Sequence, residues 1–131
     1  MLRTTRVAAL AVLALVAALG VAMPGAAALS ATKTVNGCRA DLYGSTERVV
    51  QTGIDKAYSE TLRTNSVSCN LAAYVKYRYY GGATVYTSST DWDPRWARVY
   101  GPIDTLFVSS AHFVNYDGPV TGRWFTLPTL P

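Results

Sequence analysis

The clearest pattern in the chain is an alternation of apolar and polar side chains between Ser66 and Tyr80. Apolar or aromatic residues occupy the odd-numbered positions from Val67 to Tyr79, and mostly polar residues occupy the even-numbered positions. A period of two is the repeat of a β-strand, whose successive side chains point to opposite faces, whereas a helix would mix the two sets. The pattern therefore predicts a long antiparallel strand with one face turned inward.

A Gly-Gly pair at positions 81 and 82 follows this strand and predicts a hairpin. A two-residue turn would pair Tyr77 with Tyr86 and turn Val85 outward. A three-residue loop that begins at Tyr80 would pair Tyr77 with Val85 instead, with Gly82 in the left-handed conformation that a bulged turn requires. We favour the three-residue loop because it keeps Val85 on the apolar face.

Shorter apolar segments, separated by residues that favour turns, predict further strands. They are Cys38–Tyr43, Arg48–Thr52, Ala57–Arg63, Ala83–Ser88, Trp96–Tyr100, Leu106–Asn115 and Arg123–Leu127. The turn signals between them are Gly44, Gly53, Asn65, Asp93-Pro94, Gly101-Pro102, Asp117-Gly118-Pro119 and Gly122. The apolar residues within Arg48–Arg63 could instead line a short helix, and the sequence leaves both forms open. Many short strands are typical of an all-β fold, here a small antiparallel β-sandwich, immunoglobulin-like or similar, or a partly open barrel.

The beginning of the chain has the three features of an export signal. Arg3 and Arg6 supply positive charge, an apolar stretch rich in Ala, Leu and Val follows, and small residues end it. Small side chains one and three positions before a cut suit signal peptidase, which predicts cleavage after Ala28 or Ser30. The apolar stretch is shorter than the roughly 20 residues of a spanning helix, which makes an uncleaved membrane anchor the weaker interpretation.

Removal of a signal peptide over residues 1–28 changes both the organisation and the charge of the chain. Residues 29–37 are expected to form a loose N-terminal lead, and residues 38–131 a single β domain. Two of the twelve basic residues would leave with the signal peptide, and the remaining ten against eight acidic residues give a net charge of +2. Because nucleic-acid binding requires a concentrated basic surface, this small charge disfavours it. The sequence predicts a secreted, extracellular protein without membrane contact after cleavage.

Cys38 and Cys69 are the only cysteines, and both follow the predicted leader. Outside the cytoplasm such a pair normally oxidises, and each cysteine is in phase with the inward side chains of its strand. We therefore predict a buried disulfide between them. Closing a loop of roughly 30 residues should stabilise the fold by about 3–4 kcal/mol in the chain-entropy model.

The residues that could perform chemistry do not form a recognisable catalytic or metal-binding motif. His112 is the only histidine, no Gly-x-Ser-x-Gly motif is present, and a strand histidine at a surface or interface is the simplest interpretation. One histidine and two paired cysteines cannot form a zinc site, and the Asp91-x-Asp93 spacing, with Asp104 as a third calcium candidate, is common in turns. The remaining acidic residues are scattered rather than paired for glycoside cleavage. We expect no metal, no cofactor and no enzymatic activity.

Two segments combine aromatic and charged side chains in a way that suits binding. The connection from Ser88 to Trp96 contains two tryptophans, which can stack on a sugar ring or anchor a protein partner. The outer face of the long strand alternates cations with tyrosines, which suits an anionic wall polymer or an acidic protein edge. Both also have structural interpretations, since a tryptophan can plug the end of a sandwich and Tyr, Lys and Arg are common on exposed strands. The candidate binding residues are Trp92, Trp96, Arg95, Tyr74, Lys76, Arg78 and Tyr80.

These features favour a secreted, non-enzymatic binding or interaction module whose partner is a cell-envelope polymer, such as a wall polysaccharide, or another secreted protein. The same general make-up recurs among secreted bacterial proteins. The alternative is a secreted antagonist, such as a hydrolase inhibitor or a bacteriocin-like toxin, for which Asp93-Pro94-Arg95 would have to form a rigid, protruding loop. A small hydrolase is the least favoured hypothesis, because His112 would have to meet a hydroxyl or carboxylate inside a pocket.

Overall fold

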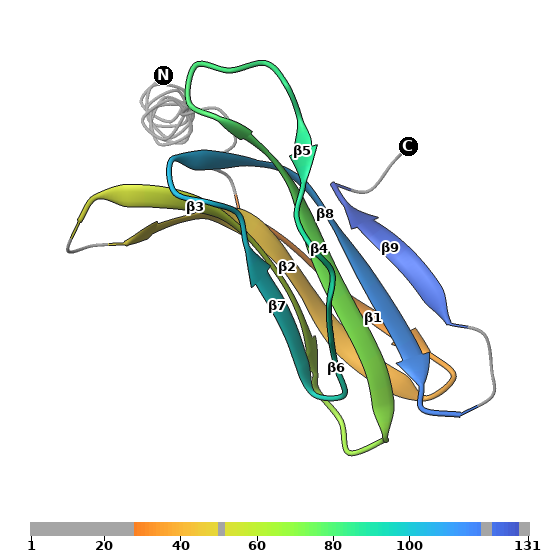
Figure 1. The fold of residues 1–131 in the computed structure, drawn as a ribbon. Coiled ribbons are helices and arrows are strands. Elements are labelled where there is room, and N and C mark those ends of the chain that lie inside the picture. Colours follow the sequence, from red (N-terminus) through yellow and green to blue (C-terminus); the bar gives the residue numbers. More distant parts are fainter. Residues whose placement is uncertain (1–27, 50–51, 119–121, 129–131) are drawn as a thin grey trace, which may run out of the picture.

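The structure, a computed structural model, describes residues 28–49, 52–118 and 122–128. The described strands are β1 (Leu29–Val35), β2 (Cys38–Val49), β3 (Ile54–Arg63), β4 (Cys69–Tyr79), β5 (Tyr86–Thr87), β6 (Asp91–Asp93), β7 (Trp96–Tyr100), β8 (Thr105–Tyr116) and β9 (Arg123–Leu127) (Figure 1). The predicted signal peptide lies outside the described residues as far as residue 27. Within the described ranges, no helix is long and apolar enough to span a membrane.

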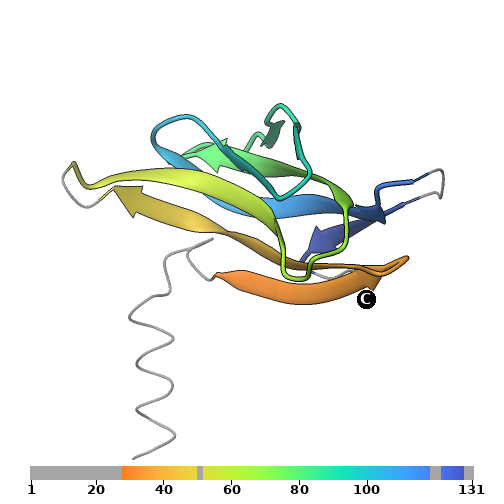
Figure 2. The same cartoon turned by 90° about the horizontal axis from the view of Figure 1, so that it is seen from below.

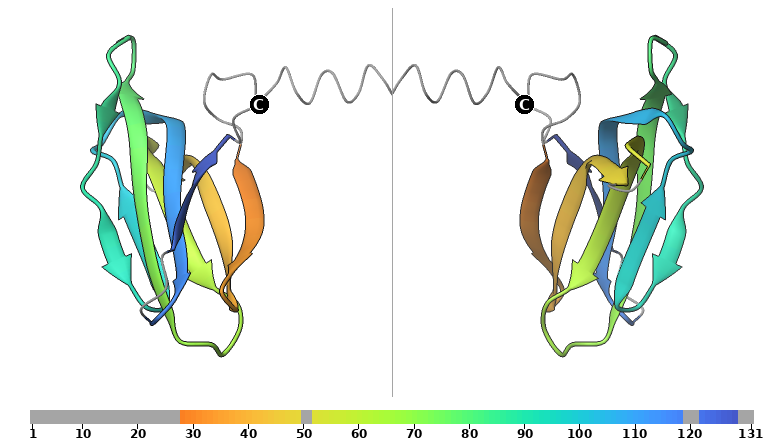
Figure 3. Two further views of the ribbon diagram at one scale, coloured as in Figure 1. Left: turned by 90° about the vertical axis from the view of Figure 1, so that its right-hand side faces the viewer. Right: turned by 90° about the vertical axis from the view of Figure 1, so that its left-hand side faces the viewer.

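The strands form two antiparallel sheets. Sheet A has the order β1-β2-β3-β7, and sheet B has the order β5-β4-β8-β9, with β6 also paired to β4. Figures 2 and 3 show the two sheets as stacked layers. This sandwich-like arrangement of two sheets confirms the prediction of an antiparallel all-β fold.

The hydrophobic core lies between the two sheets and is built by the alternation along the strands. In β4, Leu71, Ala73 and Val75 are fully buried, as the period of two predicts. The buried residues of the main cluster are Val35, Cys38, Ala40, Leu42, Cys69, Leu71, Ala73, Ala97, Val114 and Leu127. A smaller cluster of Ala57, Val75 and Phe107 lies beyond it.

The predicted disulfide is present. Cys38 is the first residue of β2 and Cys69 the first residue of β4, and their Cα atoms lie 5.6 Å apart. Both cysteines are buried. Because β2 belongs to sheet A and β4 to sheet B, the bond joins the two sheets covalently.

The prediction of a loose lead over residues 29–37 is wrong, because residues 29–35 form β1. This strand pairs with β2 along its whole length, from Leu29 opposite Gly44 to Val35 opposite Cys38. Asn36 and Gly37 form the connecting turn, and both have positive φ angles, of 51° and 86°. Asn-Gly between two alternating segments is the strongest short-range hairpin signal, so the sequence did contain the information.

Strand β2 continues through Gly44, which the sequence analysis assigned to a turn. Gly44 is a close-approach position instead: a Cβ atom there would lie 2.5 Å from the Phe107 ring and 2.6 Å from Ser110 Oγ in the facing sheet. Both β2 and β3 are extended and antiparallel, which excludes the helical alternative for their described parts. The left-handed Gly53 then precedes β3.

The β4–β5 hairpin has the register of the two-residue turn, so the preferred three-residue loop is wrong. Tyr77 pairs with Tyr86, and Gly81 rather than Gly82 has a positive φ, of 74°. The hairpin extends past the end of the sheets (Figure 1), where no core is available to Val85, which is 49% exposed. Only two residues of the expected strand over residues 83–88 are therefore paired as a strand.

The three late strands β7, β8 and β9 agree with the predictions. Strands β7 and β9 have the predicted bounds, and β8 is one residue longer at each end than predicted. Between β6 in sheet B and β7 in sheet A, Asp93 Oδ1 accepts hydrogen bonds from the backbone N–H groups of Arg95 and Trp96, at 2.8 and 2.9 Å. This carboxylate holds the turn that carries the chain from one sheet to the other.

Candidate functional site

The seven candidate binding residues do not form one surface. Tyr74, Lys76 and Trp92 belong to the outer face of sheet B, because they alternate with residues that face the core or the sheet edge. Trp96 belongs to the outer face of sheet A, since its neighbour Ala97 is buried in the core. Tyr80 lies beyond the end of β4. Sequence alternation located each residue on its strand, but it could not show which strands are neighbours.

An aromatic row crosses the outer face of sheet B and consists of Trp92, Phe113 and Trp124. Register aligns them, because Ala72 of β4 lies between Trp92 and Phe113, and Phe113 pairs with Trp124. The ring centroids are 5.2 Å apart for Trp92 and Phe113 and 5.5 Å apart for Phe113 and Trp124. Ala72 is fully buried although it faces outward, which indicates that the neighbouring rings cover it. Tyr74 extends the row, with its ring 5.4 Å from that of Trp124.

The tryptophans of the aromatic row remain accessible. Trp92 is 52% exposed and Trp124 45%. Their ring planes meet at 81°, with centroids 6.1 Å apart, so the rings support one another edge to face rather than forming a flat platform. Such pairs are worth about 0.5–1.5 kcal/mol beyond their buried area, which keeps the large side chains ordered while they face solvent. Phe113 and Trp124 were missed from the sequence.

Basic side chains lie beside the aromatic row. Lys76 is exposed two positions beyond Tyr74 on the same face of β4, and Arg78 donates a hydrogen bond of 3.4 Å to the Gly82 carbonyl. The other outward positions of β4, β8 and β9 next to the row are Asn70, Ser109, Ala111, Asn115 and Thr126. None of these outward positions is acidic, so the described part of this face combines aromatic, neutral polar and cationic side chains.

Tyr80 does not continue this face. Its hydroxyl donates to Asp55 Oδ2 of β3, and Asp55 is buried in an ion pair with Arg48, at 3.0 Å. The Tyr80 hydrogen bond, and after it the Arg48 guanidinium, lower the pKa of Asp55 against the opposing effect of burial. Tyr80 therefore ties the end of β4 to sheet A, and the predicted binding strip ends before it.

Trp96 belongs to a second aromatic group on the outer face of sheet A. Its Nε1–H donates to Glu60 Oε1 at 3.0 Å, and the Arg98 guanidinium lies 3.6 Å from the centre of its ring. The Tyr58 hydroxyl also donates to Glu60 Oε1, and burial, followed by this carboxylate, raises the pKa of Tyr58. On this face the aromatic side chains are thus bound to a carboxylate rather than only to one another.

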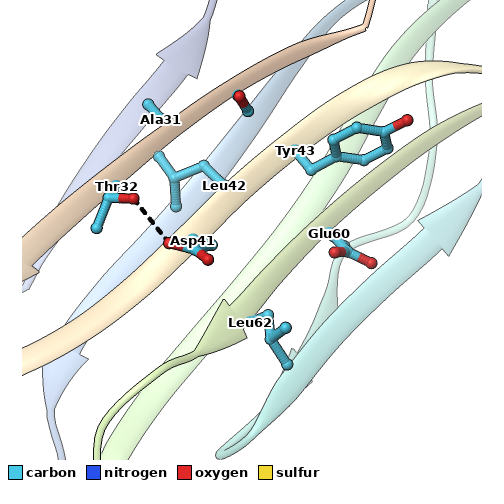
Figure 4. A pocket seen from close by; sticks show the side chains of 8 residues that line it. Ala31, Thr32, Asp41, Leu42, Tyr43, Glu60 and Leu62 are labelled. Atoms are coloured by element: carbon cyan, nitrogen blue, oxygen red, sulfur yellow. Dashed lines mark hydrogen bonds between the residues drawn. The ribbon is translucent and has the colours of Figure 1, made fainter.

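A shallow hollow of about 280 Å³ lies next to Glu60 on the same face (Figure 4). Residues of three strands line it: Ser30, Ala31 and Thr32 of β1, Asp41, Leu42 and Tyr43 of β2, and Glu60 and Leu62 of β3. This hollow could not be predicted from the sequence, because its walls come from three segments and β1 was not expected to be a strand.

The aspartates of the β6–β7 segment have structural partners. Asp93 accepts its two backbone hydrogen bonds, which lower its pKa, and Asp91 Oδ2 accepts from the Arg98 N–H at 2.9 Å. Within the described ranges, no group of three or more His, Cys, Asp or Glu side chains is placed to hold a metal ion. The exposed Arg95 lies in a tight turn, and its backbone carbonyl accepts a hydrogen bond from the Arg63 N–H at 2.9 Å.

His112 is fully buried between the sheets, so the interpretation as a surface or interface histidine is wrong. Thr61 Oγ1 donates to the Ala72 carbonyl, at 2.8 Å, and lies 2.9 Å from His112 Nδ1. With its hydroxyl proton used, Thr61 accepts from Nδ1–H, and Nε2 accepts from the Ser110 hydroxyl at 2.7 Å. Burial lowers the pKa of His112 to about 4. The imidazole is therefore neutral at pH 7 and inaccessible to a substrate.

Taken together, the geometry defines a small disulfide-linked β domain of two sheets with aromatic side chains on both outer faces. No protein-family profile, curated protein or solved structure matches the chain. The disulfide is compatible with an extracellular protein.

Proposed function

We propose that the protein is an extracellular, non-enzymatic binding module that holds an anionic cell-envelope polymer on the outer face of sheet B. The observation that carries this proposal is the aromatic row of Trp92, Phe113 and Trp124 with Lys76 beside it. The rings offer apolar surface to sugar rings, and Lys76 and Arg78 offer charge to acidic groups of the polymer.

The mutual packing of the rings in the aromatic row supports a role in binding. Exposed tryptophans that were free to rotate would lose conformational entropy on binding, whereas Trp92 and Trp124 are already held against Phe113. The differently tilted rings suit a flexible single polymer chain, whose sugar units can meet each ring separately, better than a flat crystalline surface. Because acidic side chains are missing from the described outward positions, the face does not repel an anionic ligand.

Sedimentation of the purified protein with isolated cell-envelope material tests the proposal. Trp124→Ala and Trp92→Ala should each weaken binding at least about 30-fold, the loss typical of a hot-spot aromatic. Lys76→Glu should weaken it several-fold, and added salt should have the same effect on the parent protein. Tyr100→Ala is the control, because it removes an exposed aromatic side chain from the opposite sheet.

Two outcomes would contradict the proposal: no binding to any envelope fraction, or an equal loss in the Tyr100→Ala control. Binding that survives periodate oxidation of the sugars but not protease treatment would indicate a protein partner instead. The antagonist hypothesis gains no support from the Asp93-Pro94-Arg95 segment, because this turn is tight and its last carbonyl is already hydrogen-bonded.

Export by a cleaved leader, and an immunoglobulin-like or partly open-barrel form of the fold, are parts of the same proposal. Cleavage after Ala28 would keep all of β1, whereas cleavage after Ser30 would remove the residues that pair with Gly44 and Tyr43. The start of β1 therefore favours the cut after Ala28, and the N-terminal sequence of the secreted protein would decide between the two.

A further inference from the structure

The hollow on the outer face of sheet A is a concave site on the sheet opposite the aromatic row. Asp41 and Glu60 lie on opposite sides of it, with Leu62 below them and the Tyr43 ring above in the view of Figure 4. Across β2 and β3, Asp41 pairs with Leu62 and Tyr43 pairs with Glu60. The two acidic residues are thus diagonal neighbours, with β carbons roughly 7 Å apart, and a small group can fit between their carboxylates.

Each carboxylate is oriented through one oxygen and leaves the other for a ligand. Thr32 Oγ1 donates to Asp41 Oδ1 at 2.7 Å, and Trp96 and Tyr58 both donate to Glu60 Oε1. Within the described ranges, no hydrogen bond reaches Asp41 Oδ2 or Glu60 Oε2. Neither residue forms an ion pair within the described ranges, where the Arg48–Asp55 pair lies elsewhere. Arg98 is opposite Glu60 across β3 and β7, but its guanidinium lies over the Trp96 ring. The hollow therefore has two oriented, negatively charged hydrogen-bond acceptors, and within the described ranges no cationic side chain forms an ion pair with either of them.

We propose that this hollow binds a primary ammonium group, as found in an amino sugar or a lysine side chain. An ammonium has three N–H donors, so it can reach both carboxylates at once, and the Tyr43 ring face adds a cation–π contact. A neutral hydroxyl has only one proton to donate, and an anion would be repelled. The hollow is smaller than typical pockets for drug-sized ligands, which begin at roughly 300 Å³, so it suits one terminal group and not a whole oligomer.

This inference is independent of the proposed function, because the hollow and the aromatic row lie on different sheets. Loss of one site should leave the other intact. A domain with both sites would hold an acidic polymer on sheet B and an amine-bearing group on sheet A, and the failure of either proposal can be recognised separately.

Isothermal titration of the purified protein with the β-1,4-linked glucosamine trimer tests the inference, with the N-acetylated trimer as the matched probe. At a pH where the amines are protonated, the free-amine trimer should bind and the acetylated trimer should not. Asp41→Asn and Glu60→Gln should each weaken binding at least about tenfold, as expected for a charge-assisted hydrogen bond. Asp117→Asn, a removal of negative charge from an exposed position outside the hollow, should have little effect.

A second probe, Nα-acetyl-lysine amide, distinguishes the two sources of the ammonium group. If it binds with the same dependence on Asp41, the site recognises the amine alone, and if only the sugar binds, the sugar body contributes as well. Thermal melting of each variant shows whether the fold is intact. If Asp41→Asn is unstable, Glu60→Gln provides the test. Tyr43→Phe, which keeps the ring, should retain binding. Equal binding of the acetylated trimer, or unchanged binding by folded Asp41→Asn and Glu60→Gln variants, would overturn the inference.

Discussion

The two sheets are held together in different ways at the disulfide end and in the middle of the interior. At one end the Cys38–Cys69 bond lies among Ala40, Leu71 and Val114, which have no side-chain polar groups to satisfy. In the middle, the facing sheets meet through hydroxyl groups and His112. The covalent contact does not depend on acidity, whereas the hydrogen-bonded contact requires a neutral imidazole. The same interior therefore contains one contact that resists pH and one that responds to it.

The largest effect is expected from removal of the disulfide. The double variant Cys38→Ala/Cys69→Ala should lose about 3–4 kcal/mol of unfolding free energy, because the unfolded chain regains the freedom of the closed loop. For a domain of this size the melting temperature should fall by about 15 °C or more. Urea denaturation of the oxidised protein, the protein with dithiothreitol, and the double variant provides the measurement. Equal stability of all three would show that the apolar contacts suffice at this end.

The next largest effect is expected from lowering the pH, which acts on His112 in the middle of the interior. The folded pKa of His112, about 4, lies below the ordinary value of 6.5, so between these two values the unfolded chain binds a proton that the folded chain does not. Stability from this group is therefore complete above pH 6.5 and should fall by about 3 kcal/mol as the pH drops to 4. Urea denaturation across this range measures the loss, and His112→Gln should abolish it.

A direct measurement sharpens the same comparison. His112 is the only histidine, so its ring protons can be assigned in an NMR titration without further variants. A midpoint near 6.5 in the folded protein would contradict its burial as a neutral group. The double cysteine variant should keep the same pH dependence, since the two contacts are separate.

The smallest effect is expected from a buried hydroxyl group in the middle region. Ser59 Oγ is buried, and within the described residues it has no hydrogen-bond partner. Ser59→Ala should raise the unfolding free energy by about 1 kcal/mol, because it removes a desolvated polar group that gains nothing in return. Thr61→Val is the contrasting variant and should be destabilising, since Thr61 connects the Ala72 carbonyl to His112. A loss of stability in Ser59→Ala would indicate that a water molecule satisfies the hydroxyl.

Features that depend on one segment were predictable from the sequence. The alternation over residues 66–80 gave β4, the strands at Trp96–Tyr100 and Arg123–Leu127 have the predicted bounds, and the phase of the cysteines indicated their inward direction. Strand β1 was missed because Lys33 occupies an inward position of its pattern. Lys33 remains acceptable there because its ammonium group lies 5.3 Å from the centre of the Phe125 ring near the sheet edge.

Features that depend on the alignment of several strands could not be predicted from one sequence. The aromatic row requires Trp92, Phe113 and Trp124 to come into register from three strands, and the hollow requires Asp41 and Glu60 to become diagonal neighbours. Burial of His112 likewise depends on Thr61 from the opposite sheet. Local periodicity determines the face on which a side chain lies, but only the strand order determines its neighbours.

The position of the disulfide also has a consequence for what happens when a protease cuts the chain. The bond encloses the segment from Cys38 to Cys69, which contains β2, β3 and the connection at residues 64–68, where Ser66 and Ser68 are exposed. Exposed connections of this kind are preferred sites of proteolytic cleavage. A single cut there would leave two fragments that stay attached through sulfur, so the cleaved protein would keep its mass, apart from one added water, until a reductant released the pieces.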